Sequence, residues 1–470
     1  METAALDIAR TQFAVTTVFH MTWPLLSIGL SLMMVVMEIL WLRTGNETYY
    51  RQIRFWSPIF LLTFGIGVAS GVPLEFQFGT NWSRFSAAAG DFFGSVLAYE
   101  AAMSFALEAA FLAVFVFGWN RVSRGVHLFS GVMVAFGASL SAFWIMAANS
   151  WMQTPAGARM EGGRIVITDY FRALFSPDLP IAFAHIWAAA VETTLFFVCG
   201  VCAWYIIRKR NVSFFLQTFK VMAVVGIIVA PLQIFLGDAS GLTVIRHQTA
   251  KAAAFEAHWV TNEPGVPASW VAVAWPDRDA QSNRWEIKIP YMLSLLATHT
   301  LRGQVTGLRD IPVGEQPPVT LPFYAFRIMV LLGVAMILLV AWALWKWLRK
   351  ELREEAAPKH RVFWTLWIWA LPAGFIATDC GWIVREVGRQ PWVIFGILRT
   401  RDAVSPVGAA VSAASLALFI AAYTCLLGLF ILFTRRILEK GPDLTSPLPA
   451  YRARNRAVRP GDAETSEGRM

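Results

Sequence analysis

The stretch AVTTVFHMTWPLLSIGLSLMMVVMEIL, from Ala14 to Leu40, decides the fold class of this chain. A helix needs roughly 20 mostly apolar residues to cross the hydrocarbon core of a bilayer, and this run is longer than that. It is also too long for the apolar region of a signal peptide, and no small-residue cleavage site follows it. The run therefore predicts a transmembrane helix that stays in the mature protein.

Further apolar runs of the same kind follow along the 470 residues. The predicted spans are 14–42, 55–79, 93–119, 126–151, 181–207, 219–237, 323–348, 362–386 and 407–434. The composition agrees, because 56% of the residues are hydrophobic, only 15% are charged, and the mean hydropathy is +0.52. A helix is the form in which each segment satisfies its own backbone in lipid. We predict an all-α, polytopic membrane protein with about nine transmembrane helices.

The orientation is predicted by lysines and arginines that gather in alternate connections, because such loops prefer the cytoplasm. They are Arg43, Arg51, Arg54, Arg121, Arg124, Arg208, Lys209, Arg210, Lys346, Arg349, Lys350 and Arg353, with Arg435, Arg436, Lys440, Arg452, Arg454 and Arg456 after the last span. The net charge of +9 is thus a topology signal and no sign of nucleic-acid binding. The N-terminus is predicted outside and the C-terminus inside. Helices one to six occupy 1–237, an outer loop 238–322, helices seven to nine 323–436, and an inner tail 437–470.

Ionisable residues inside the predicted spans are functional candidates, because charge is costly in a membrane. For each one, an interhelical hydrogen bond is the alternative interpretation. The candidates are His20, Glu100, Glu108, His185, Glu192, Arg327, Asp379 and Glu386.

Four side chains of the ligating type are predicted to share the outer leaflet. They are His20, His185, Met329 and Glu386, on helices one, five, seven and eight. Imidazole and thioether groups are familiar axial ligands of haem iron. Met329 alone would be interpreted as a core or lipid-facing residue. Together, the four residues indicate haem ligation.

Two glutamates on helix three suggest a path for protons. At 1.5 Å per residue, Glu100 lies roughly 10 Å and Glu108 roughly 22 Å below the outer end of the predicted span. Both fall on broadly the same side of the helix, as a proton relay requires. A structural pair of hydrogen-bonded glutamates is the alternative.

The remaining histidines argue against other haem proteins of the membrane. Copper-haem oxidases and bis-histidine cytochromes b place several histidines on a few helices, whereas this chain has only 7 histidines and no helix with two at ligand spacing. The five others are predicted to be solvated or capping residues. These are His127, His247, His258, His299 and His360.

The sequence GWIVREVGRQPW, from Gly381 to Trp392, matches the GW-x-x-x-E-x-GRQPW signature of cytochrome bd subunit I. Five further segments resemble that family in the same order, so the resemblance covers most of the chain. They are RTQFAVTTVFH, GVPLEFQFGTNWS, YEAAMSFALE, SLSAFWIMAANSWMQ and FRIM.

This resemblance implies three haem groups. His185 and Met329 match the axial pair of a low-spin haem b, which takes electrons from quinol. His20 and Glu386 match the ligands of two high-spin haems, one haem b and one haem d, and the order of the two ligands stays open. Further cofactor contacts implied by the resemblance are Arg327, Trp382 and Arg389.

The resemblance also implies catalytic positions. Glu100 and Glu108 match acidic residues of haem ligation and proton delivery, and Ser141 matches a position on a proton path. Lys251 and Glu256, in KAAAFE, match a lysine and a glutamate of quinol oxidation. Without the resemblance, the last two would be interpreted as a solvated pair in a polar loop.

The implied function is that of a bd-type terminal oxidase in a bacterial cytoplasmic (inner) membrane. It would oxidise ubiquinol or menaquinol near the periplasmic loop and reduce oxygen to water with cytoplasmic protons, without pumping. The loop is of the family's short kind, which includes cyanide-insensitive members, so a third haem b in place of haem d stays open. The expected partners are subunit II and small single-helix accessory subunits. A proton-coupled transporter and a haem quinol oxidoreductase with another acceptor are the alternatives, although no internal repeat supports a transporter.

Overall fold

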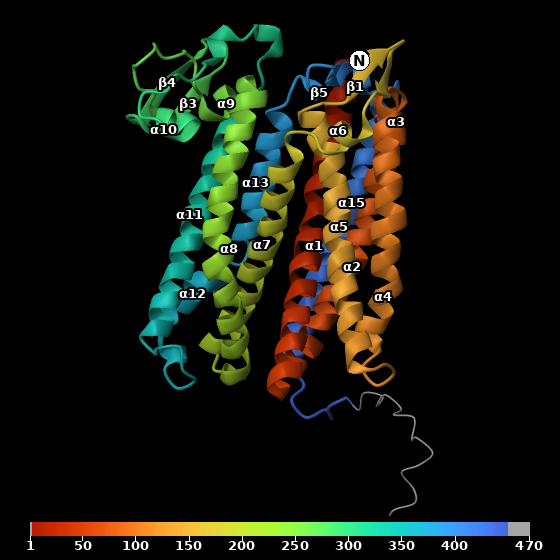
Figure 1. Cartoon of the computed structure of the whole chain (residues 1–470), viewed down its shortest axis with the longest axis vertical. Coiled ribbons are helices and arrows are strands. Elements are labelled where there is room, and N and C mark those ends of the chain that lie inside the picture. Colours follow the sequence, from red (N-terminus) through yellow and green to blue (C-terminus); the bar gives the residue numbers. More distant parts are fainter. Residues whose placement is uncertain (1, 450–470) are drawn as a thin grey trace, which may run out of the picture.

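The computed structural model describes residues 2–449, and within them nine helical segments are long and apolar enough to cross a membrane, as predicted. Residues 450–470 of the predicted inner tail lie outside the described residues. The segments run side by side (Figure 1). They are α1 (Glu2–Thr44), α2 (Glu47–Thr80), α3 (Ser83–Tyr99) continued by α4 (Ala106–Phe117), α5 (Arg124–Gln153), α7 (Leu179–Ile207), α8 (Val212–His247), α11 (Thr320–Leu348), α12 (Arg361–Trp369) with α13 (Ala373–Val387), and α15 (Ala409–Lys440).

The helices extend beyond the predicted apolar runs, most clearly in α8. The prediction ended this span at residue 237, but the helix continues to His247. Hydropathy marks only the apolar part of a helix, and the segment from Asp238 to His247 contains no proline that would stop it. The first turns of the predicted outer loop are therefore helical.

Two of the segments are irregular. Helix three contains a π-helical stretch, Glu100–Phe105, between α3 and α4. Helix eight is divided into α12 and α13 close to Pro372, whose ring prevents a continuous helix because it removes a backbone donor and clashes with the preceding turn. Both irregularities lie in segments that carry candidate site residues.

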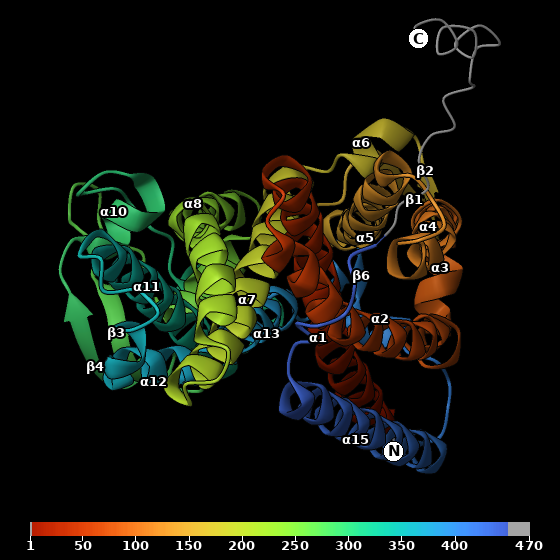
Figure 2. The ribbon, with the colours of Figure 1, turned by 90° about the horizontal axis from the view of Figure 1, so that it is seen from below.

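The segments form two groups that meet along α1 and α7. One group holds α7, α8, α11 and α13, and the other holds α1, α2, α3–α4, α5 and α15 (Figure 2). A large apolar core fills the end remote from the long connection, where Trp364 and Trp367 pack on Phe219, and Trp367 stacks on Phe196 with ring centroids 5.1 Å apart. This end of the bundle is closely packed by the chain itself.

The long connection between α8 and α11 folds at the opposite end, which we call the loop-bearing end. The N-terminus lies there too, whereas α15 finishes at the other end (Figure 1). The connection contains α9 (Thr249–Glu256), strands β3 (Trp270–Asp277) and β4 (Ser282–Ile289), α10 (Met292–Thr298) and two short 3-10 turns, Leu308–Asp310 and Val313–Glu315. β3 and β4 pair antiparallel.

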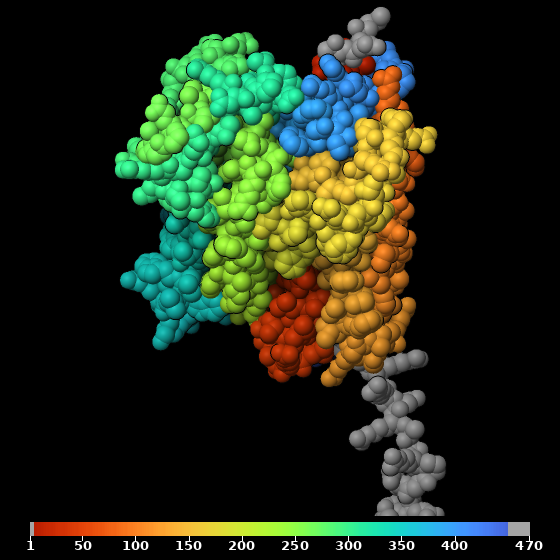
Figure 3. All heavy atoms as spheres, turned by 45° about the horizontal axis from the view of Figure 1, so that its top comes forward, coloured from red at the N-terminus to blue at the C-terminus, as the bar shows by residue number. Residues whose placement is uncertain are grey.

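Smaller elements cover the rest of this end. In the space-filling view the segment after α13 (blue) lies between the long connection (green) and the segment after α5 (yellow) (Figure 3). The latter two contain the hairpins β1 (Ala158–Glu161) with β2 (Arg164–Ile167) and β5 (Trp392–Ile394) with β6 (Leu398–Arg399), besides α6 (Tyr170–Leu174) and α14 (Thr400–Ala403).

Candidate functional site

His20 of α1 is held against α2 by one ring nitrogen. Its Nδ1 lies 3.0 Å from the Ser70 hydroxyl oxygen, and that hydroxyl donates to the carbonyl of Ile66 at 2.8 Å. When the Ser70 hydroxyl donates its hydrogen to Ile66, Nδ1 is the donor to Ser70 and Nε2 keeps its lone pair free. A Cβ at Gly71 would lie 2.8 Å from the same ring, so α2 approaches it closely. This is the arrangement in which an imidazole binds iron, with its other nitrogen oriented by a hydrogen bond.

His185 and Met329 belong to the group formed by α7, α8, α11 and α13. His185 Nδ1 is buried and has no hydrogen-bond partner among residues 2–449. A Cβ at Gly237 of α8 would lie 3.5 Å from the His185 ring, and one at Gly381 of α13 would lie 3.2 Å from the Met329 sulfur. Each of these two side chains is therefore faced by a glycine, where any larger residue would occupy the space beside it.

The four predicted iron ligands all lie towards the loop-bearing end. His185 is six residues into α7, Met329 is nine residues into α11, and Glu386 is the last residue but one of α13. Gly71, which faces His20, comes nine residues before the end of α2. At 1.5 Å per residue, these positions lie within roughly 15 Å of that end of the helices.

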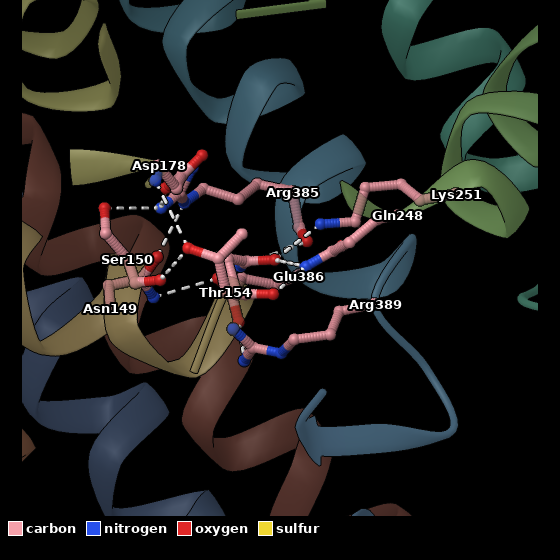
Figure 4. A network of polar contacts seen from close by, with 10 residues as sticks. Asn149, Ser150, Thr154, Asp178, Gln248, Lys251, Arg385, Glu386 and Arg389 are labelled. Atoms are coloured by element: carbon pink, nitrogen blue, oxygen red, sulfur yellow. Dashed lines mark hydrogen bonds and ion pairs between the residues drawn. The ribbon is translucent and has the colours of Figure 1, made fainter. Parts of the chain in front are cut away.

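Glu386 is oriented by three donors (Figure 4). Asn149 and Gln153 of α5 donate to its Oε1 at 2.9 and 3.0 Å, and Arg389, just beyond α13, forms an ion pair with its Oε2. The Glu386 side chain is nevertheless 30% exposed. It is thus fixed in direction and still accessible to a group placed beside it.

Gln153 joins Glu386 to the helix α9. Its Oε1 accepts hydrogen bonds from Lys251 Nζ at 2.5 Å and from Gln248 Nε2 at 3.0 Å, while its Nε2 donates to Glu386. Lys251 is only 3% exposed. Burial lowers the pKa of Lys251 well below its usual range, and nearby arginines lower it further. A single amide thus connects the predicted quinol-oxidising lysine with a predicted iron ligand.

Glu256, at the other end of α9, faces α11 instead. Arg327 Nη2 donates to Glu256 Oε2 at 2.6 Å, and the Arg327 guanidinium also donates to the Val271 carbonyl at 2.9 and 2.7 Å. The Trp270 ring lies over the guanidinium, with its centroid 4.4 Å away. Burial raises the pKa of Glu256, and the adjacent Arg327 opposes that shift.

The interpretation of Lys251 and Glu256 as a solvated pair is wrong. Both are buried, at 3% and 7% exposure, and each has its own partner on a different helix. Hydropathy could not reveal this, because α9 is covered by contacts with residues far away in the sequence.

Several residues of this network escaped the sequence analysis. Arg385 Nε donates to Asn149 Oδ1 at 2.6 Å, and its Nη2 reaches Asp178 at 2.5 Å and the Ser150 hydroxyl at 3.1 Å (Figure 4). Arg385 occupies a variable position of the GW-x-x-x-E signature, so the motif does not mark it. Asp178 precedes α7, where an acidic residue is common for helix-capping reasons alone. Gln153 lies in a segment of family resemblance, but its bridging position was unpredicted.

The residues present fit haem. Buried guanidinium nitrogens without a partner among the described residues are Arg389 Nε and Nη1 and Arg327 Nη1. Unpaired buried donors are costly, and the propionates of a haem are suitable acceptors. In residues 2–449, no three His, Cys, Asp or Glu side chains gather as a bare metal ion would require. Haem iron needs only one or two protein ligands, which matches the separate positions of His20 and His185.

Trp382 is the remaining predicted cofactor contact. It is partly buried and packs with Met146 of α5 and with Leu179 and Ala182 of α7. Its ring therefore lies where α13 meets the helices that carry Gln153 and His185.

Glu100 and Glu108 both face α5. Glu100 Oε1 accepts a hydrogen bond of 2.5 Å from the Ser141 hydroxyl, and a Cβ at Gly137 would lie 3.1 Å from the Glu108 Cβ. Gly137 and Ser141 are four residues apart, so the two glutamates contact adjacent turns of α5. The π-helical stretch begins at Glu100, and such wide turns are frequent at functional sites. They change the angular spacing of the residues that follow, which helps to turn both carboxylates to one side.

His127 requires a correction. It was predicted to be a solvated or capping residue, but it is fully buried, and its Nδ1 lies 2.8 Å from Glu38 Oε1. The first turn of α5 directs His127 inward against α1, which hydropathy does not reveal. By contrast, His247 and His299 are exposed.

We predict that the Asp178–Arg385 ion pair stabilises the fold. Arg385→Met leaves Asp178, whose side chain is 4% exposed, without its charged partner. The expected cost is about 3–5 kcal/mol, measured as a lower thermal unfolding temperature of the purified protein. The double variant Asp178→Asn with Arg385→Met should recover much of this loss, and a single variant as stable as the parent protein would contradict the prediction.

Comparisons with known proteins give a consistent result. The sequence profile of the family "Cytochrome bd terminal oxidase subunit I" matches residues 8–442. Cytochrome bd ubiquinol oxidase subunit 1 of Bacillus subtilis (strain 168) is 37% identical over 452 residues, covering 93% of this chain and 94% of the relative. Cytochrome bd-II ubiquinol oxidase subunit 1 of Escherichia coli (strain K12) is 33% identical, with 93% and 97% covered. The solved bd oxidase of Geobacillus thermodenitrificans aligns with a TM-score of 0.86 at 28% identity, over 93% of this chain and 99% of the solved one.

Proposed function

The chain belongs to the cytochrome bd terminal oxidase subunit I family, and from this premise we propose where its quinol, haems and protons are handled. As a member it is a multi-pass membrane protein of a quinol:oxygen oxidoreductase, with haem as its cofactor class. The observation that carries the proposal is the hydrogen-bonded connection from Lys251 through Gln153 to Glu386. It joins helix α9 of the long connection to a side chain of the iron-ligating type.

The proposed haem ligands come from both helix groups. His185 and Met329 would hold a low-spin haem b between α7, α8, α11 and α13. His20 and Glu386 would serve two high-spin sites, occupied by haem b and by haem d or a further haem b. When bound, the haems carry the electrons and supply the oxygen chemistry. Arg389 would place its unpartnered donors on a propionate, because a guanidinium matches a carboxylate in geometry.

The proposed quinol site lies around α9. An amine whose pKa is lowered is neutral over more of the pH range, so Lys251 can accept a proton from the quinol hydroxyl. Glu256, held by Arg327, is positioned as the second proton-accepting group of this region. Quinol, either ubiquinol or menaquinol, would thus release its protons at the loop-bearing end, which we infer to be periplasmic from the arginine and lysine pattern.

Protons for water formation would come from the other side. Glu108 lies deeper in the bundle than Glu100, and the Ser141 hydroxyl extends the polar path beside Glu100. Carboxyl groups one turn of α5 apart can pass a proton between them by rotation of their side chains or through a water molecule. Uptake from the cytoplasm with release at the periplasm charges the membrane without pumping.

The proposed setting is a bacterial cytoplasmic membrane in a complex with subunit II. The solved relative is a bd oxidase, and the related chains are named as subunit 1 of such enzymes. Small single-helix accessory subunits complete the proposed assembly.

The central test combines haem analysis with oxygen uptake. The purified complex should contain extractable haem and consume oxygen when supplied with quinol. His185→Ala or Met329→Leu should remove the low-spin signal from the reduced-minus-oxidised spectrum while the high-spin signals remain, because each deletes one axial ligand. Unchanged spectra in both variants would refute the ligand assignment.

Glu108→Gln should slow turnover by about 100-fold or more, the usual contribution of a positioned proton-transfer group. The quinol KM should change little, because Glu108 lies away from α9. Asp91→Asn, at an exposed position of α3, is the matched control and should keep full activity. An effect confined to KM would argue against proton delivery.

The role of Lys251 predicts a pH dependence of quinol oxidation. As the pH falls through the lowered pKa of Lys251, the amine takes up a proton and loses its capacity as a base, so kcat/KM should decline on the acidic side. Lys251→Met should be slow at all pH values and lack this decline, while dithionite still reduces its haems. Lys288→Met, a change at an exposed lysine of the same connection, should keep the profile of the parent protein.

A further inference from the structure

Strand β4 alternates charged and apolar residues, yet no part of the described chain covers its apolar side. The sequence RWEIKI places Arg284, Glu286 and Lys288 on one face and Trp285, Ile287 and Ile289 on the other. Trp285, Ile287 and Ile289 are 51%, 59% and 43% exposed. Such strict alternation normally means that the apolar side is covered.

Strand β3 extends the same apolar surface. Val273 pairs with Ile287 across the hairpin, and Trp275 follows two residues later on the same side. Val273 and Trp275 are 43% and 53% exposed. We call the surface made of Val273, Trp275, Trp285, Ile287 and Ile289 the hairpin face.

The hairpin face points away from the protein. Val271 and Ala274, on the opposite side of β3, are buried in a cluster with residues of α9 and α11. Their partners across the hairpin are Lys288 and Glu286, so the charged residues of β4 lie on the side opposite its apolar residues, where Lys288 remains exposed. The apolar residues are therefore on the side that faces away from α9 and α11. Five large apolar side chains exposed together indicate an apolar environment outside the hairpin.

Contacts with α11 give the depth of the hairpin. The Tyr324 hydroxyl donates to the Ala274 carbonyl at 2.8 Å, and Arg327 donates to the Val271 carbonyl at 2.9 Å. Arg327 is seven residues into α11, so β3 lies beside the outermost turns of that helix, roughly 10 Å from its start. The hairpin is therefore level with the end of a transmembrane helix and does not lie above it.

The hairpin also projects sideways from the helices. Seen along the bundle, β3 and β4 lie at the edge of the molecule, next to α11 (Figure 2). Helix α11 itself carries exposed apolar residues, among them Leu321, Ile328 and Leu331 at 52%, 44% and 68% exposure. The hairpin face thus lies beside a helix that also exposes apolar side chains.

We propose that the hairpin face is inserted in the outer interface of the lipid bilayer. Trp275 and Trp285 would lie at the headgroup level, where tryptophan is favoured, and the three aliphatic residues would reach the upper acyl chains. The ion pairs Lys288–Glu286 and Arg284–Asp277 keep the charges of the hairpin on its other side. The partner of this surface is lipid, which holds the connection carrying Lys251 and Glu256 against the membrane from which a lipophilic quinol arrives.

This inference depends on the transmembrane placement of α11 and on no step of the quinol chemistry. Its test uses Ile287 and Lys288, two adjacent residues of β4 whose side chains lie on opposite faces of the hairpin. Each is replaced by cysteine in a Cys425→Ser background, because Cys425 is exposed whereas Cys199, Cys202 and Cys380 are buried. The whole complex, labelled with an environment-sensitive fluorophore, is placed in phosphatidylethanolamine–phosphatidylglycerol vesicles, and the haem spectrum verifies that each variant is folded.

Nitroxide groups attached near the top of the lipid acyl chains should quench the label at Ile287→Cys several-fold more than the label at Lys288→Cys. Iodide in the aqueous phase should show the reverse order. Equal quenching at the two positions would overturn the proposal. A label at Ile287→Cys that is shielded from iodide and also insensitive to the nitroxide lipids would overturn it as well, because a protein partner would then cover the face.

Discussion

The structure depends on the neutralisation of charge where α5, α9 and α13 meet. Lys251, Arg385 and Arg389 lie there with the carboxylates of Asp178 and Glu386, and Lys251, Arg389 and Asp178 have little access to water. Isolated charges are not tolerated in such surroundings, so each must be paired, hydrogen-bonded or neutralised. Two arginines balance the two carboxylates, and burial favours the neutral form of the lysine. This requirement locks three chain segments, far apart in the sequence, into one arrangement.

The need to pair buried charges also distinguishes the two ends of the molecule. The end remote from the long connection is filled by aromatic and aliphatic side chains, such as Trp364 and Phe219, which leave polar groups little place. The loop-bearing end contains the proposed iron ligands, where Gly71 lies against the His20 ring and Gly381 lies against the Met329 sulfur. Close packing at one end thus gives rigidity, while the other end supplies room and donors for cofactors.

Helix α9 connects the charge network at Glu386 to the hairpin of β3 and β4. It directs Lys251 to the network at Glu386 and Glu256 to Arg327, so the two ends of one short helix contact two different helices. Arg327 also holds β3, and β3 carries the outward apolar face of the hairpin. Arg327 therefore links the hairpin and Glu256 through direct hydrogen bonds.

Hydropathy by itself determined the nine spans, and the GRQPW signature with its companion segments determined the family, because both are properties of neighbouring residues. Helix ends were less predictable, as α8 shows, since a helix continues into water when nothing stops it. Only the tertiary structure decided that Lys251 and His127 are buried, that Gln153 bridges Lys251 and Glu386, and that Arg385 pairs with Asp178. These features arise from contacts between segments that are distant in sequence. The energy of each contact depends on how far water is excluded from it, which a local sequence pattern cannot predict.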